Sequence, residues 1–152
     1  MAQANDLPEA QRLQKIGFII SRTVDVERAI SFFIIQFRMM QKIELHKNPY
    51  DFVAELSTKK KINEFFRLIR ENSDIFQMTN EVKEGIKKIE KLRNHTAHEA
   101  FSFDKIEEEY RFINQQGNST YYPMKDIDEY GQFCTYIEKE ITKLTIKIPK
   151  KK

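Results

Sequence analysis

The segment KLRNHTAHEAF, residues 91–101, concentrates side chains that can do chemistry. Four of them lie within six residues: Arg93, Asn94, His95 and His98. Histidine acts as a general acid or a general base near neutral pH. Arginine binds a carboxylate or a phosphate through two parallel hydrogen bonds. These residue types are typical of a site that holds an anionic group and moves protons around it.

Arg93 continues the apolar face of a helix expected over residues 79–98. Helical spacing puts Val82, Ile86 and Ile89 on one stripe, and Arg93 follows Ile89 by four residues. A charge buried there without a partner is very costly, so Arg93 needs a carboxylate or a phosphate beside it. Two interpretations stay equally open: a buried structural ion pair and a functional arginine.

The relative placement of Arg93 and His98 poses a geometric problem. Five residues along an unbroken helix turn the side chain by about 140°, so these two would point to different sides. Asn94 and His98, four residues apart, share a face. Three solutions are possible: the helix ends or bends near Thr96, the Arg93 side chain reaches round the helix, or two copies of the chain complete the site across a two-fold interface.

The expected acidic partner of Arg93 is Glu27. It continues the apolar spacing of Ile16, Ile20 and Val24, so it falls on a mainly apolar helix face. A buried glutamate and a buried arginine on two helices would satisfy each other. Three other acidic residues compete for this role: Glu44, Glu64 and Glu71.

Other kinds of site fit the same residues less well. His95, His98 and the adjacent Glu99 could suggest a metal, but zinc sites need three or four well-placed ligands and the remaining histidine, His46, is far away in sequence. A cysteine nucleophile is no better, because Cys134 lies on a core-like helix and a buried cysteine is normally inert. With no glycine-rich phosphate loop either, we expect no metal and no cofactor.

Helical spacing predicts the elements that must position these residues. The expected helices cover residues 5–45 (one long helix or two in tandem), 56–74, 79–98, 105–116 and 125–144. Ser57 or Thr58 and Thr79 are expected to start two of them, and Asp104 with Glu107 resembles a capping box that opens a third. Residues 117–123 read as a loop. The sum is an all-α, up-and-down bundle of five or six helices in a single domain, residues 1–146, followed by a basic tail, residues 147–152.

Composition limits the environment and the partners. The net charge of +3 over 152 residues permits RNA or DNA as a partner without requiring either. A single cysteine and the absence of a leader-like N-terminus suggest a cytoplasmic protein. The longest apolar run, ISFFIIQF at residues 30–37, is too short to span a bilayer. Because this run is apolar nearly all round, we expect it to be buried in the bundle or against a second subunit. We predict a homodimer whose interface includes part of this run and the helix that carries Arg93.

The sequence RNHTAH, residues 93–98, fits Arg-Asn-x-x-Ala-His, a form of the arginine-to-histidine signature of the HEPN superfamily. The position of the motif at the end of a helix and an all-α chain of this size fit the same superfamily. The chain therefore resembles HEPN proteins, specifically over residues 79–101 and loosely over nearly all the rest.

The resemblance implies a dimer in which two copies of the motif meet in a cleft. Active members are metal-independent endoribonucleases, many of them prokaryotic toxins or antiviral effectors. Carried over to this chain, Arg93 and His98 match the signature, and Asn94 matches the polar residue after the arginine, so these three are the expected catalytic residues. His95 falls in the variable positions, and we place it among the RNA-binding residues. Where one subgroup has a tyrosine modified by its antitoxin, this chain has Ala100, which argues against that mode of control.

The implied reaction suits the residue types. RNA cleavage without a metal uses the 2′-hydroxyl as the nucleophile, and it needs one group to take the proton and another to protonate the leaving 5′-oxygen. Histidine suits both tasks, and arginine can bind the extra negative charge that develops on phosphorus. We therefore expect an endoribonuclease acting on RNA as a homodimer, with a possible antitoxin or regulatory partner. The alternatives are a catalytically inactive HEPN-like module that binds a protein or a nucleotide, and a structural bundle in which Arg93 neutralises a buried acid.

Overall fold

The computed structural model describes residues 8–43 and 48–151. These residues form six helices and three strands, and they are 66% helical. The elements follow in the order α1 (Glu9–Met40), α2 (Pro49–Ala54), α3 (Thr58–Glu71), α4 (Asn80–His98), β1 (Ala100–Asp104), β2 (Glu109–Ile113), β3 (Ser119–Pro123), α5 (Met124–Asp128) and α6 (Tyr130–Ile146). The expected helix over residues 5–45 is thus one helix, and its outermost residues lie outside the described ranges.

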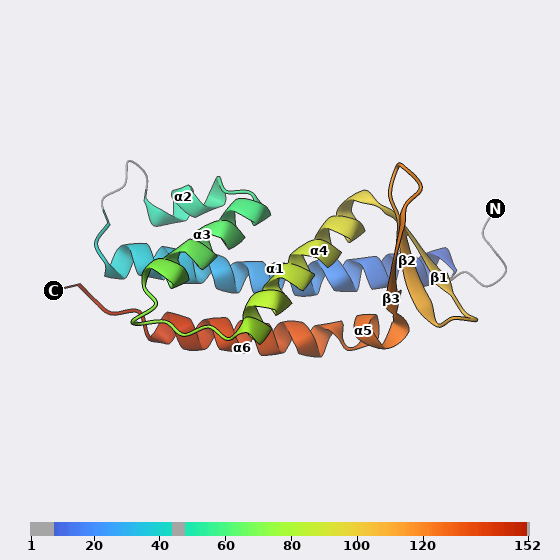
Figure 1. The fold of residues 1–152 in the computed structure, drawn as a ribbon. Helices are drawn as coiled ribbons and strands as arrows, with labels where there is room; N and C mark the ends of the chain where they lie inside the picture. The colour runs from blue at the N-terminus through green and yellow to red at the C-terminus, as the bar shows by residue number, and fades with distance from the viewer. Residues whose placement is uncertain (1–7, 44–47, 152) are drawn as a thin grey trace.

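The long helix α1 is the axis of the molecule (Figure 1). Helix α6 packs along it more extensively than any other pair of elements does. Helices α2 and α3 pack on its C-terminal half, and α4 crosses it toward the sheet at the other end (Figure 1). The apolar run at residues 30–37 lies where these helices converge. Phe33 and Ile34 there are fully buried by a single chain, and Phe32 is the large apolar side chain of the run that stays exposed, at 52%.

The all-α prediction is wrong, because residues 100–123 form an antiparallel sheet. Its strand order is β1-β2-β3. Phe101 faces Phe112 across the first pair of strands, and Tyr110 faces Tyr122 across the second. Alternating aromatic residues cover one face of the sheet, and Phe101, Tyr110 and Phe112 are all buried. This period of two is the pattern of a half-buried strand rather than of a helix.

Asp104 starts a turn rather than the helix expected over residues 105–116. Its Oδ1 accepts hydrogen bonds from the backbone N–H groups of Ile106 and Glu107, and the chain then turns through Glu108, whose φ is 52°. An aspartate offers the same hydrogen bonds to a turn and to a helix N-terminus. The local sequence alone therefore does not distinguish the two, and strand pairing decides.

The loop expected at residues 117–123 is only partly a loop. Residues 114–118 form the turn between β2 and β3. Asn114 Oδ1 accepts from the N–H groups of Gln116 and Asn118, and Gly117 supplies a φ of 84° that other residues rarely adopt. The rest of that segment is strand β3. The predicted helix over residues 125–144 is divided at Glu129 into α5 and α6.

The helix starts predicted at Ser57 and Thr79 are confirmed. The side-chain oxygens of Ser57 and Thr79 accept hydrogen bonds from the first turns of α3 and α4. Residues 147–151, the described part of the predicted tail, pack against the end of α1. Ile148 is buried there, and the Lys151 N–H donates to the Met40 carbonyl at 2.9 Å. Within the described ranges, none of the helices has the length and apolarity needed to cross a bilayer.

Candidate active site

Helix α4 carries the motif and continues without interruption to His98. The proposed helix end near Thr96 is therefore not found. The buried stripe of the helix runs from Val82 through Ile86 and Ile89 as expected. Beyond Ile89 it continues through Leu92 and Thr96, which are 4% and 8% exposed. The stripe thus shifts by one residue and leaves Arg93 at its edge.

Arg93 is partly exposed instead of buried in the core. Its Nη1 donates a hydrogen bond to Oδ1 of Asn94 at 3.4 Å. Within the described residues it makes no ion pair. The long side chain therefore reaches round the helix toward the face that Asn94 shares with His98, which is the second of the three solutions considered above.

The motif residues converge on one hollow, the motif cleft, of about 600 Å³. It lies between α4, α1 and the junction of α2 with α3. Its lining residues are Glu27, Leu56, Ser57, Thr58, Lys59, Glu90, Arg93, Asn94 and His98. The structure thus brings together four predicted site residues, three from α4 and one from α1. His98 is exposed at the end of α4, so it is accessible to a ligand.

Glu27 reaches the motif cleft with partners other than the predicted one. Its Oε1 accepts hydrogen bonds from Lys61 Nζ at 3.2 Å and from Thr58 Oγ1 at 3.1 Å. The expected direct pair with Arg93 is replaced by this pair with Lys61, which α3 places beside Glu27. The charge of Glu27 is compensated by a lysine, which leaves the Arg93 guanidinium available.

Two charged residues of the cleft, Lys59 and Glu90, were not singled out from the sequence. Glu90 precedes Arg93 by three residues and Asn94 by four, so helical spacing could have identified it. Lys59 comes from the start of α3, and its proximity depends on how α3 packs. In addition to Arg93, the cleft therefore holds a second cationic group, Lys59 from α3, and an anionic group from α4, Glu90.

His95 lies on a different side of α4. Its Nδ1 bonds to the Glu99 carboxylate, and its ring stacks on Phe112 with 5.6 Å between the ring centroids. The rings of Tyr122 and His95 meet edge to face, with 6.1 Å between their centroids. The His95 side chain is only 14% exposed. These contacts fasten the sheet to the end of α4. The predicted RNA-binding role of His95 finds no support in this position.

The buried ion pair that the sequence suggested for Arg93 belongs to Arg38. Its Nη2 donates to Glu64 Oε1 at 2.9 Å, and its guanidinium lies 3.9 Å from the centroid of the Phe52 ring. Arg38 is 8% exposed. Arg67 binds the same carboxylate and also pairs with Glu71. Two competitors of Glu27 are thereby occupied elsewhere, and the third, Glu44, lies outside the described residues.

The other candidate groups have structural positions. Cys134 is fully buried, and burial raises the pKa of its thiol to about 11, so the thiol stays protonated at neutral pH. Among residues 8–43 and 48–151, no three His, Cys, Asp or Glu side chains are grouped as metal ligands would be. His46 lies outside these ranges.

The cleft offers a definite set of chemical groups: a guanidinium without an acidic partner among the described residues, an amide beside it and an exposed imidazole. These groups can hold a phosphate and exchange protons with it.

Comparison with known proteins gave no match, since no family model, curated protein or solved structure is significantly similar to this chain.

Proposed function

We propose that the protein is a metal-independent endoribonuclease of the HEPN type. The observation that supports this best is the convergence of Arg93, Asn94 and His98 on the motif cleft. A structural arginine would be expected to meet an acidic partner, yet Arg93 makes no ion pair among the described residues. Its guanidinium is therefore available for a phosphodiester.

The proposed reaction is an attack of the ribose 2′-oxygen on the adjacent phosphorus. A base removes the 2′-hydroxyl proton, the bond from phosphorus to the 5′-oxygen breaks, and an acid protonates that oxygen. His98 supplies one of these proton transfers. Arg93 binds the non-bridging oxygens as charge develops on them, and Asn94 holds the guanidinium in place. The products are a 2′,3′-cyclic phosphate and a 5′-hydroxyl.

A second proton-transfer group comes, in this proposal, from a second copy of the chain. His95 does not supply it, since it is packed on the sheet. The apolar run at residues 30–37 no longer suggests an interface, because one chain covers most of it. The support comes instead from Leu13 and Ile20, which are 60% and 44% exposed and share a face of α1 with Glu27. An apolar stripe that leads to the motif cleft suits a homodimer.

The biological role that follows is that of a toxin or defence effector acting on cytoplasmic RNA. Such an activity would need control by an antitoxin or another regulatory protein. The alternative, a catalytically inactive HEPN-like module, predicts binding of a protein or a nucleotide without cleavage of RNA.

The direct test is incubation of the purified protein with RNA in EDTA, followed by end-group analysis. We expect fragments with 2′,3′-cyclic phosphate and 5′-hydroxyl ends. A single 2′-deoxy substitution at a cut site should abolish cleavage there and leave binding largely intact, because the phosphate contacts remain. Cleavage at the deoxy position, 5′-phosphate ends, or loss of activity in EDTA would each contradict the mechanism, and no cleavage of any RNA would favour the inactive module.

A further inference from the structure

A second hollow lies on the other side of α4 from the motif cleft, because Lys88 and Leu92 lie on the helix face roughly opposite to that of Glu90 and Asn94. It measures about 480 Å³, which is within the usual range of ligand pockets. We call it the aromatic hollow, because Tyr122, Tyr130 and Phe133 line it. Nothing in the proposed reaction uses these residues.

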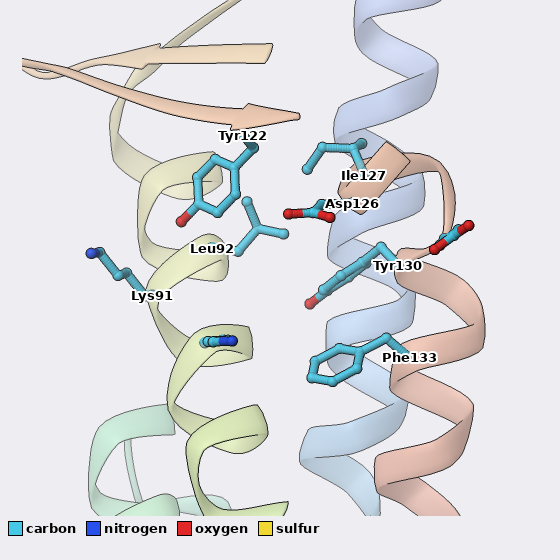
Figure 2. A pocket seen from close by; sticks show the side chains of 9 residues that line it. Lys91, Leu92, Tyr122, Asp126, Ile127, Tyr130 and Phe133 are labelled. Atoms are coloured by element: carbon cyan, nitrogen blue, oxygen red, sulfur yellow. The ribbon is translucent and has the colours of Figure 1, made fainter. Parts of the chain in front are cut away.

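The walls of the aromatic hollow suit a flat ring. Tyr130 and Phe133 extend from α6 toward α4, and Tyr122 extends from β3 above Leu92 (Figure 2). Leu92 and Ile127 also line the hollow and are buried, so much of its wall is apolar. Bases of single-stranded RNA are commonly recognised by stacking on aromatic side chains.

The rim of the hollow carries positive charge on its α4 side and negative charge on its α5 side. Lys88 and Lys91 line it from α4, where both are exposed and neither makes an ion pair among the described residues. Asp126 lines it from α5, with its carboxylate directed toward the space between α4 and α6 (Figure 2). The Asp126 carboxylate, like the two lysines, makes no ion pair in the described part of the chain; Lys15 pairs with Asp128 instead. The arrangement suits a ligand with an anionic group at one end and N–H donors at the other.

The exposed edge of α4 connects the two hollows. Lys91, Asn94 and His98 follow one another at spacings of three and four residues, so they lie on one exposed ridge. At about 1.5 Å of rise per residue, Lys91 and His98 are separated by roughly 10 Å along the axis. An extended strand covers that distance with about one or two nucleotides.

We propose that the aromatic hollow binds one base of the RNA strand, one or two nucleotides from the scissile phosphodiester. Lys88 and Lys91 hold the adjacent phosphates while the strand crosses the ridge of α4. The inference rests on the proposed ribonuclease function and adds a specificity site to it.

Asp126 determines which base fits best. An ionised carboxylate only accepts hydrogen bonds, so it selects a base edge that donates them. Guanine presents two adjacent N–H groups to a carboxylate, at N1 and at the 2-amino group. The other bases present only one such group on that edge. Guanine is therefore the expected base, and inosine, which lacks the 2-amino group, is its closest control.

The first experiment measures binding without cleavage. Fluorescein-labelled 2′-O-methyl oligonucleotides of uridine with a single guanosine cannot be cut by 2′-hydroxyl attack, and their affinity follows from fluorescence anisotropy. We expect K88A/K91A to weaken binding about tenfold. The matched control, K139A/K143A, removes two lysines from α6 and should change the affinity less than about threefold. Wild type should prefer guanosine over inosine about fivefold, and Asp126→Asn should abolish that preference.

The second experiment maps cleavage in the unmodified oligonucleotides, with circular dichroism as the check that each variant is folded. Cuts at a fixed offset from the single guanosine, lost in Asp126→Asn, support the aromatic hollow as a base site. Equal affinities of K88A/K91A and K139A/K143A, or equal binding of guanosine and inosine by wild type, would overturn it. Binding as proposed without any cleavage would retain the base site and refute the ribonuclease, whereas cleavage that none of the hollow variants alters would refute the base site alone.

Discussion

The guanidinium of Arg93 lies against the side chain of Asn94, its immediate neighbour, with Nη1 donating to Oδ1 at 3.4 Å. Adjacent residues on a helix point about 100° apart, so their side chains do not normally meet. The contact is possible because the arginine side chain is long enough to reach round α4. The contact brings the guanidinium toward the face that holds His98, and Arg93 and His98 both line the motif cleft.

Arg93→Ala and His98→Ala should each lower RNA cleavage at least about 100-fold, because one removes the proposed phosphate-binding group and the other the proposed proton-transfer group. Neither residue is buried or ion-paired within the described chain, so the melting temperature should change by no more than a few degrees. Arg70→Ala is the matched control, since Arg70 is an exposed arginine on α3 outside the cleft. Initial rates on a fluorogenic RNA and thermal melts would give both quantities. Full activity in both cleft variants would refute the proposed catalytic roles.

Replacing Leu13 and Ile20 by glutamate should convert the proposed homodimer to a monomer. Two charges on the exposed apolar stripe of α1 would have to be buried at the interface without partners. Light scattering coupled to size exclusion at micromolar concentration measures the mass. Phe32→Glu is the control, because Phe32 is also exposed but lies on a different face of α1. A wild-type chain that is monomeric under these conditions would remove the basis for a composite active site.

Glu64→Gln should destabilise the fold by about 2 kcal/mol at pH 7, because it leaves Arg38 buried without a carboxylate partner. The Arg38 and Glu64 side chains are mostly buried, so solvent screens their interaction only in part. Although burial opposes the ionised form, hydrogen bonds and charge from Arg67 and Arg38 lower the pKa of Glu64 below its ordinary value.

That stabilisation should depend on pH in one direction. A carboxyl group whose pKa is lower in the folded than in the unfolded state contributes fully above its unfolded pKa of about 4.3, and the contribution is lost as pH falls through the folded pKa. Urea unfolding of wild type and Glu64→Gln should therefore give a large difference at pH 7 and a smaller one at pH 3. A difference that is constant over this range would show that the ionised pair contributes little.

Cys134 should be unreactive toward Ellman's reagent in the native protein at pH 8. The side chain is fully buried, and burial raises the pKa of the thiol to about 11. Reaction should follow unfolding and be immediate in concentrated urea. RNA cleavage should persist after treatment of the native protein with iodoacetamide. Rapid native labelling with loss of cleavage would instead support a cysteine nucleophile.

The motif and the helix that carries it could be predicted from the sequence. The start at Thr79, the apolar stripe through Val82, Ile86 and Ile89, and the burial of Cys134 all follow from local hydrogen bonding and from a period of 3.6 residues. These features depend on residues close together in the chain, where the pattern of side chains is sufficient.

Only the tertiary structure decided the rest. The alternation of aromatic residues within residues 100–123 already indicates strands, but Asp104 offers the same hydrogen bonds to a turn and to a helix. The pairing of Phe101 with Phe112 and of Tyr110 with Tyr122 across strands selects the turn. Glu27 meets Lys61 rather than Arg93 because α3, more than thirty residues further on, packs beside it. The proximity of charged groups from different helices depends on how whole elements pack, and that depends on the burial of the entire core rather than on the spacing within any one helix.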